Sequence, residues 1–247
     1  MNNNQILAVW GSPGSGKTVT VIKIAKALES MKHSVAIVLC DDEIPMIPIL
    51  LPNGKQHNYL SIGELLSQPR ISQAEILKYS IPYGNDNISL LGYILEDNEM
   101  KYPEYSPSTA KSLLISLSRL VDNIIIDCSN HISSNVLSIV SLESADVVLR
   151  VVNASLKSYM YIRSQRQLLV DSRFHYEKYK TVLNNISPGQ DDSTYSNLFG
   201  KTSYILPHCP TIIEQYETGK LTDSLFGREA KRYEPIINEI VKDVFIN

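Results

Sequence analysis

Cysteine is scarce in this chain, and long apolar runs are missing from it. Its three cysteines, Cys40, Cys128 and Cys209, are an odd and scattered set without a CxxC pair. Such a set disfavours a disulfide framework or a zinc or iron–sulfur site, and it fits a reducing compartment. No apolar run approaches the roughly 20 residues that span a bilayer. The opening residues MNNNQILAVW lack the order of a signal peptide, so we expect a cytoplasmic protein.

A strong excess of charge of either sign is also missing. The 23 basic and 26 acidic residues leave a formal net charge of −3, which argues against a protein that coats nucleic acid over its whole surface. Hydrophobic residues make up 43% of the 247 residues and charged residues 20%, a composition typical of a globular protein with a full core.

Apolar segments rich in Val, Ile and Leu recur along the chain, and each precedes a pattern typical of a helix. This alternation predicts βαβ units around a parallel sheet. The seven predicted strands begin at Gln5, Ser34, Ile88, Asn123, Asp146, Lys180 and Ser203. The predicted helices cover 18–30, 61–79, 108–120, 135–143, 155–170 and the chain from about 228. We predict one α/β domain over residues 1–247, with a doubly wound, mostly parallel sheet and helices on both faces.

Three stretches interrupt the alternation and are predicted to be irregular. Residues 42–60 follow the second strand and are rich in proline, and residues 95–107 are polar. Residues 186–202 have the composition of a mobile surface loop.

The stretch GSPGSGKT, residues 11–18, follows the first predicted strand and opens a helix. It matches G-x-x-x-x-G-K-[ST] at every fixed position. Its glycines let backbone N–H groups turn inward around phosphate oxygens, and the helix adds the positive end of its dipole. In this motif Lys17 reaches the β- and γ-phosphates and the Thr18 hydroxyl ligates Mg²⁺. The predicted phosphate-binding residues are Gly11, Ser12, Pro13, Gly14, Ser15, Gly16, Lys17 and Thr18.

Three acidic residues at two predicted strand ends are candidate partners of this loop. Asp127 closes the apolar segment DNIIID, and a loop of this type needs a strand-end carboxylate to hold Mg²⁺. We predict that Asp127 and Thr18 form the metal site, with a capping aspartate as the alternative interpretation. Asp41 and Asp42 end the second strand, where a functional role for Asp41 and a solvated turn remain open.

These segments resemble, in order, those of the ParA/MinD superfamily of deviant Walker ATPases. GSPGSGKT is similar to the first motif, VAIVLCDD to the strand that ends in the catalytic aspartate, and DNIIIDCSN to the switch segment. SADVVLRVVNASLKS and TVLNNIS are similar to the two strands that follow. The resemblance implies that Asp41 is catalytic with Lys17, that Asn184 or Asn185 contacts adenine, and that ATP and Mg²⁺ are the cofactors.

Three departures from the family pattern fall in the catalytic neighbourhoods. The family's second lysine, which reaches across a dimer to the partner's nucleotide, falls on Ser12. A neutral hydroxyl cannot supply a cation to the transferring phosphate, and such cations are worth orders of magnitude in rate. Cys40 and the segment Cys128–Asn130 also differ from the usual residues. We therefore predict weak hydrolysis and a character closest to the divergent CpaE/TadZ-like branch.

The resemblance further implies a homodimer that acts as a positioning, partition or assembly factor. Its partner would belong to a localisation, secretion, pilus or conjugation apparatus. Non-specific DNA binding by the basic segment 155–180 is less favoured than a solvated helix face. The apolar stripe from Ile236 to Phe245 is predicted to pack into the core and not to contact a membrane. The alternatives are a non-hydrolysing scaffold and, ranked lower, a small-molecule kinase, because 186–202 lacks the arginines of a kinase lid.

Overall fold

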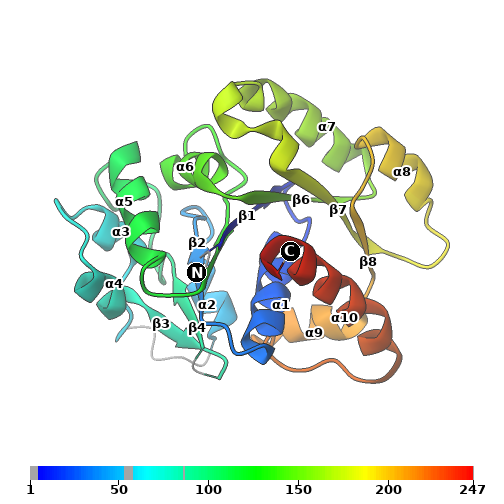
Figure 1. The fold of residues 1–247 in the computed structure, drawn as a ribbon, viewed down its shortest axis with the longest axis horizontal. Helices are drawn as coiled ribbons and strands as arrows, with labels where there is room; N and C mark the ends of the chain where they lie inside the picture. Colours follow the sequence, from blue (N-terminus) through cyan, green and yellow to red (C-terminus); the bar gives the residue numbers. More distant parts are fainter. Residues whose placement is uncertain (1–4, 53–57, 86, 247) are drawn as a thin grey trace.

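The computed structural model describes residues 5–52, 58–85 and 87–246. Over these residues, eight strands form one sheet in the order β3-β4-β2-β5-β1-β6-β7-β8 (Figure 1). Only β3 runs antiparallel to its neighbour in this described sheet. The strands are β1 (Gln5–Gly11), β2 (Val35–Leu39), β3 (Ile81–Tyr83), β4 (Ile88–Leu91), β5 (Asn123–Asp127), β6 (Val147–Asn153), β7 (Tyr179–Ile186) and β8 (Tyr204–Pro207). The predicted doubly wound, mostly parallel sheet is confirmed.

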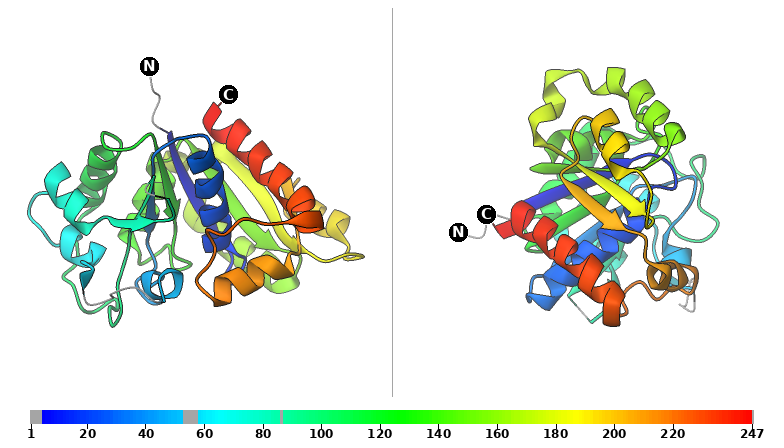
Figure 2. Two further views of the ribbon diagram at one scale, coloured as in Figure 1. Left: turned by 90° about the horizontal axis from the view of Figure 1, so that it is seen from below. Right: turned by 90° about the vertical axis from the view of Figure 1, so that its right-hand side faces the viewer.

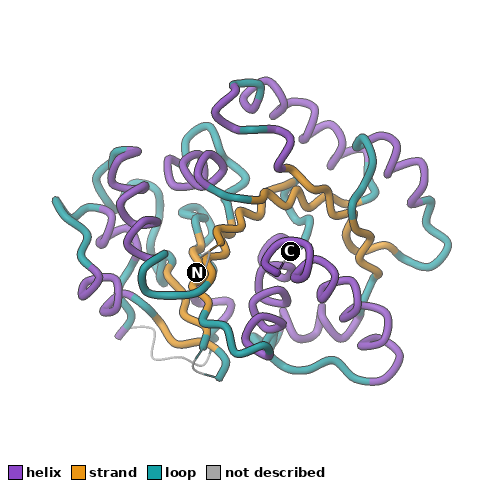
Figure 3. The backbone as a smooth tube through the Cα atoms, viewed as in Figure 1, coloured by secondary structure: helices purple, strands orange, loops and turns teal. Residues whose placement is uncertain are grey.

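Helices cover both faces of the sheet, as the tube drawing shows (Figure 3). One face carries α1 (Lys17–Ser30), α2 (Ile47–Leu50), α9 (Pro210–Glu217) and α10 (Gly227–Val241). The other face carries α3 (Ile62–Leu66), α4 (Gln73–Tyr79), α5 (Pro107–Leu117), α6 (Val136–Ser144) and α7 (Leu156–Gln165). A 3₁₀ turn, η2 (Arg166–Leu169), extends α7, and α8 (Asp192–Leu198) lies beside β7.

Side chains that alternate between the two faces of each central strand explain why the core has two halves. On β1, Leu7 and Val9 join the cluster under α1 and α10, whereas Ala8 and Trp10 join the cluster on the opposite face. Successive residues point to opposite faces of a strand, so a strand buried on both faces must be apolar throughout. This is why the central strands β2 and β5 consist almost wholly of apolar residues.

Several predicted boundaries are wrong, for local reasons. The helix expected over 61–79 is two helices, because the chain breaks at Pro69 and restarts at Ser72, which forms a capping box with Glu75. The loop expected over 186–202 contains α8, whose first turn is capped by the Asp191 side chain accepting from Thr194 N at 2.9 Å. The irregular stretch 42–60 contains α2, and its residues 53–57 lie outside the described residues. The short β3 was not predicted.

The last helix packs into the core, as its apolar stripe predicts. Figure 2 shows α10 alongside α1, and its buried residues include Ile237, Ile240 and Val241. Val244, just beyond the helix, is buried in the same cluster. None of the described helices combines the length and apolar character needed to cross a bilayer.

Candidate functional site

The loop between β1 and α1 is shaped by close backbone approaches that only glycine tolerates. A Cβ on Gly11 would lie 1.8 Å from the carbonyl oxygen of Val151 on β6. Gly16 has φ +87°, and its Cβ would lie 2.3 Å from Asn184 Nδ2 on β7. Gly14 has φ +68° and faces open space. The tight turn therefore follows from the glycine spacing that the sequence shows.

The N-terminus of α1 is open toward this loop. Gly16 is its N-cap, and in the described structure no side chain accepts a hydrogen bond from the first turn. No acidic residue occupies that turn either. The Ser15 hydroxyl beside it is buried and, among the described residues, has no hydrogen-bond partner. Unpaired N–H groups at a helix N-terminus attract an anion, so this end of α1 favours an anionic group.

Lys17 extends from the start of α1 toward the switch segment. Its ammonium donates a hydrogen bond to Asn130 Oδ1, and the side chain is only 9% exposed. Burial lowers the pKa of Lys17, while the nearby charges of Asp127 and Asp41 oppose that shift. Asn130 was identified in the sequence only as a departure from the family pattern. The structure shows that it contacts the phosphate-loop lysine.

Thr18 and Asp127, the two residues of the predicted metal site, lie in contact. The Thr18 hydroxyl donates to Asp127 Oδ2 at 2.5 Å. Burial raises the pKa of Asp127 to about 6, against the opposing effects of Lys17 and the Thr18 hydrogen bond. The second carboxylate oxygen, Oδ1, is buried and has no hydrogen-bond partner within the described part of the chain.

These oxygens fit Mg²⁺. Mg²⁺ prefers oxygen ligands and is bound through one or two carboxylates with waters and substrate phosphates. It therefore needs no larger protein cluster, and among residues 5–52, 58–85 and 87–246 no group of three His, Cys, Asp or Glu could hold a metal. An unpartnered carboxylate oxygen beside a hydroxyl at the phosphate loop is the arrangement expected for this ion.

Asp41 lies just beyond the end of β2, at the edge of the same site. Its Oδ1 accepts hydrogen bonds from the backbone N–H groups of Ile44 (2.9 Å) and Glu43 (3.2 Å). Its charge also affects the pKa of both Lys17 and Asp127. Asp41 therefore shapes a turn and faces the site. Asp42 points elsewhere and accepts from Asn135 Nδ2 at 3.2 Å.

The two candidate asparagines differ in their surroundings. Asn184 is 8% exposed, and its Nδ2 donates to Ser15 O at 2.7 Å, which fixes the loop against β7. Asn185 is exposed, and its Oδ1 lies 2.7 Å from His208 Nδ1. Both line a pocket of about 140 Å³ beside the loop, whose apolar walls come from Val19, Pro207, Ile212, Ile213 and Tyr216. Apolar walls with a few polar groups are typical of small-molecule sites.

Ser12 faces into the protein. It is 1% exposed, and its hydroxyl lies 2.7 Å from the hydroxyl of Ser158 at the start of α7. Nearby, Asn153 Nδ2 donates to Gly14 O at 3.1 Å. Sequence reasoning missed Ser158 and Asn153. Their only signal was their place at the carboxyl end of a predicted strand and the turn after it.

Comparison with solved structures relates this geometry to known proteins. A ParA-family ATPase from Chlorobium tepidum superposes with a TM-score of 0.77 at 14% identity, over 98% of each chain. The septum site-determining protein MinD from Pyrococcus horikoshii, complexed with Mg-ADP, superposes with a TM-score of 0.72 at 15% identity, over 96% of each chain. This chain has the ParA/MinD-type P-loop fold.

The ParA/MinD-type fold extends over nearly the whole chain. A protein from Borrelia burgdorferi, described as a plasmid partition protein and bound to AMPPNP, covers 98% of this chain and 100% of its own at 17% identity, with a TM-score of 0.68. No protein-family model and no curated protein sequence matches the chain. The predicted resemblance is therefore confirmed at the level of the fold, and the CpaE/TadZ-like branch stays a prediction.

Proposed function

We propose that this protein binds ATP with Mg²⁺ and acts as a ParA/MinD-type positioning, partition or assembly factor. The observation that carries the proposal is the open N-terminus of α1 beside Lys17 and the Thr18–Asp127 pair. Structural neighbours bound to Mg-ADP and AMPPNP support the choice of ligand. A bound Mg²⁺ would neutralise phosphate charge at this pair.

Each side chain has a role that fits its place. Lys17 and the N–H groups of residues 14–18 would hold the phosphates, and Thr18 with Asp127 would hold the metal. The pocket beside Asn184 and Asn185 would take the adenine ring. Since Asn184 Nδ2 already donates to Ser15 O, its Oδ1 and the Asn185 amide are the groups available to the base. Asp41 would orient the attacking water.

We further propose that hydrolysis is weak and that the protein works as a homodimer. A buried Ser12 that is hydrogen-bonded to Ser158 within the same chain cannot reach a partner's nucleotide. The cation that speeds phosphoryl transfer in the family is then missing at this position. The same observation favours the second candidate function, a scaffold that holds nucleotide without turnover.

The test is the mass of the protein in solution, measured with ATP and Mg²⁺, with ADP, and without nucleotide, together with phosphate release. Lys17→Ala is the control. We expect dimers that require ATP and disappear in the variant, with slow phosphate release. Dimers that form equally well without nucleotide, with no phosphate released, would favour the second candidate function, the scaffold. Failure of the wild-type protein to bind ATP would overturn both functions.

A further inference from the structure

A second pocket lies on the opposite face of the sheet from α1. Its volume is about 330 Å³, within the usual range of small-molecule sites. It is bounded by α7 and η2 on one side and by β6, β7 and the end of α8 on the other, elements that lie side by side in Figure 1. The phosphate loop does not line it.

The lining of this pocket is basic. Arg150, Arg163, Arg166 and Lys201 contribute to it, and among the described residues no acidic side chain does. None of the four forms an ion pair within the described structure, although the protein as a whole has a net charge of −3. A cluster of unpaired cations in an acidic protein favours an anionic ligand.

Arg150 is the most informative of these residues because it is only 7% exposed. Its guanidinium donates to the Thr181 hydroxyl from Nε (3.1 Å) and Nη2 (2.6 Å), and to Phe199 O at 2.9 Å. Its Nη1 donates to the Tyr176 hydroxyl at 2.8 Å. All of these acceptors are neutral. A buried charge held only by neutral groups is costly, and an anion in the pocket would offset that cost.

Aromatic rings supply the rest of the wall. The rings of Tyr176 and Tyr179 stack at 5.2 Å with an interplanar angle of 17°. The Tyr179 hydroxyl is buried and has no hydrogen-bond partner within residues 5–52, 58–85 and 87–246. Tyr159 lies under the Arg163 guanidinium, 5.8 Å from its ring centroid. Flat aromatic faces next to guanidinium groups suit a planar ring that carries phosphate.

We infer that this pocket binds a small phosphate-bearing aromatic molecule of the nucleotide class, independently of the phosphate loop. Arg163, Arg166 and Lys201 hold its phosphate, Arg150 supplies the buried positive charge, and the tyrosines contact its ring. The phosphate of a free mononucleotide and that of a nucleic acid strand share this chemistry. The limited volume of the pocket, about 330 Å³, favours a single free nucleotide over a strand.

Trp10 connects this pocket to the phosphate loop. It lines the pocket and directly precedes Gly11, and its ring lies 6.1 Å from that of Tyr161. The Tyr161 hydroxyl donates to Asn130 O at 2.5 Å, and Asn130 Oδ1 accepts from Lys17. Trp10 is also the one tryptophan of the chain, so its fluorescence reports on the pocket.

The experiment measures binding of AMP, GMP, CMP and UMP to the full chain by equilibrium dialysis and by Trp10 fluorescence. The variants are Lys17→Ala, which disables the phosphate loop, and Arg163→Ala/Arg166→Ala, which removes two exposed cations of the pocket. The matched control is Arg70→Ala/Arg119→Ala, two exposed arginines outside the pocket. A 20-nucleotide oligothymidylate tests the nucleic acid alternative.

We expect at least one monophosphate to bind wild type, Lys17→Ala and the control alike. The Arg163→Ala/Arg166→Ala variant should bind it about tenfold or more weakly, since charged hydrogen bonds to phosphate are lost, while its ATP binding is retained. The inference would be overturned if monophosphate binding disappeared in Lys17→Ala, or if it were unchanged in Arg163→Ala/Arg166→Ala. Binding of the oligonucleotide without binding of any monophosphate would also overturn it, and so would the absence of binding by every probe. If the wild-type protein did not bind ATP, the proposed function would be overturned but this inference would not.

Discussion

At the scale of the residue, Asp127 carries a buried carboxylate whose hydrogen bonding within the described residues is incomplete. Its carboxylate is buried, with one oxygen bonded to Thr18 and the other unpartnered in the described structure. Burying an ionised carboxylate without full hydrogen bonding destabilises the folded state. A cation bound at Oδ1, as proposed for Mg²⁺, would offset that penalty.

We therefore predict that Asp127→Asn abolishes Mg²⁺-dependent ATP binding and stabilises the empty protein. The folded-state pKa of about 6 lies above the ordinary 3.8, so the folded state holds the extra proton between these values. Stability from this group is thus full below about pH 4 and falls as pH rises to about 6. The free energy of unfolding of the variant should lack this dependence on pH and should exceed that of wild type by on the order of 1–2 kcal/mol at pH 7. Urea unfolding with EDTA from pH 4.5 to 7 measures it, and parallel curves for both proteins would refute the assignment.

Two glycines of the loop offer a matched comparison. Gly11→Ala would place Cβ 1.8 Å from a backbone oxygen of β6, so the sheet must shift, at a cost of about 3 kcal/mol or more. Gly14→Ala enters open space and is opposed only by φ +68°, at a cost of about 1 kcal/mol. Urea unfolding of both variants checks the order. Equal losses would contradict the close approach to Val151.

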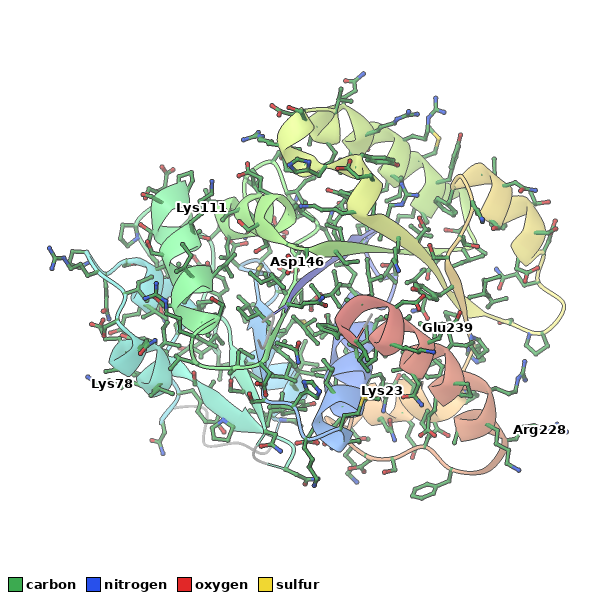
Figure 4. All side chains as sticks on the ribbon, viewed as in Figure 1. Lys23, Lys78, Lys111, Asp146, Arg228 and Glu239 are labelled. Carbon is green, nitrogen blue, oxygen red and sulfur yellow. The ribbon has the colours of Figure 1, made fainter. Side chains whose placement is uncertain are left out.

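At the scale of the element, a buried lysine joins α1 to the connection between α9 and α10. Figure 4 shows Lys23 between α1 and α10. Its ammonium donates to Gln215 Oε1 (2.6 Å), Leu221 O (2.8 Å) and Asp223 O (3.3 Å). Gln215 and Leu221 are buried, so without Lys23 their oxygens would lose a buried donor, and Lys23 thereby fixes the irregular segment that precedes α10.

Lys23 should make stability depend on pH in the alkaline range. Burial lowers its pKa to about 8 from 10.5, so the unfolded chain binds more protons than the folded one between these values. The contribution of this group to stability therefore rises with pH across that window. From pH 7.5 to 9.5, the stability of wild type relative to Lys23→Met should increase by on the order of 1 kcal/mol. Chemical unfolding of both proteins measures the difference, and a constant difference would contradict the prediction.

The elements themselves were predictable to different degrees. Seven of the eight described strands were predicted, most clearly β2 and β5, because burial on both faces leaves an unbroken apolar pattern there. The sequence does not indicate β3, because three residues carry too little periodicity, or α8, because Asp191 and its neighbours have the composition of a loop. Helix 61–79 was predicted as one element because an apolar pattern continues across the break at Pro69.

At the scale of the whole molecule, the strand order assembles the site. β1 lies between β5 and β6, and β2 and β7 lie beyond them. The carboxyl ends of these parallel strands meet at one edge, which brings Asp41, Asp127, Asn153 and Asn184 around the loop. Segments about 170 residues apart, such as Ser15 and Asn184, thus become hydrogen-bonded neighbours.

A ligand that binds only this assembled edge should stabilise the whole fold. We predict that ATP with Mg²⁺ raises the free energy of unfolding by about 2.7 kcal/mol at a free concentration 100 times its Kd, because the unfolded chain has no such site. Thermal unfolding over a series of ATP concentrations measures the shift. Lys17→Ala should show little of it, and an equal shift in both proteins would place the nucleotide elsewhere.

The sequence by itself determined the parallel α/β class and the tight glycine turn before α1, and it predicted the metal site at Thr18 and Asp127, because these depend on local spacing and on apolar runs. The tertiary structure decided which way the polar side chains face. It directed Ser12 inward to Ser158, joined Lys17 to Asn130, engaged Asn184 with the loop backbone and gathered four cations around the second pocket. Those contacts join residues far apart in the chain, and the packing of β6, β7 and α7 fixes them, so no local pattern encodes them.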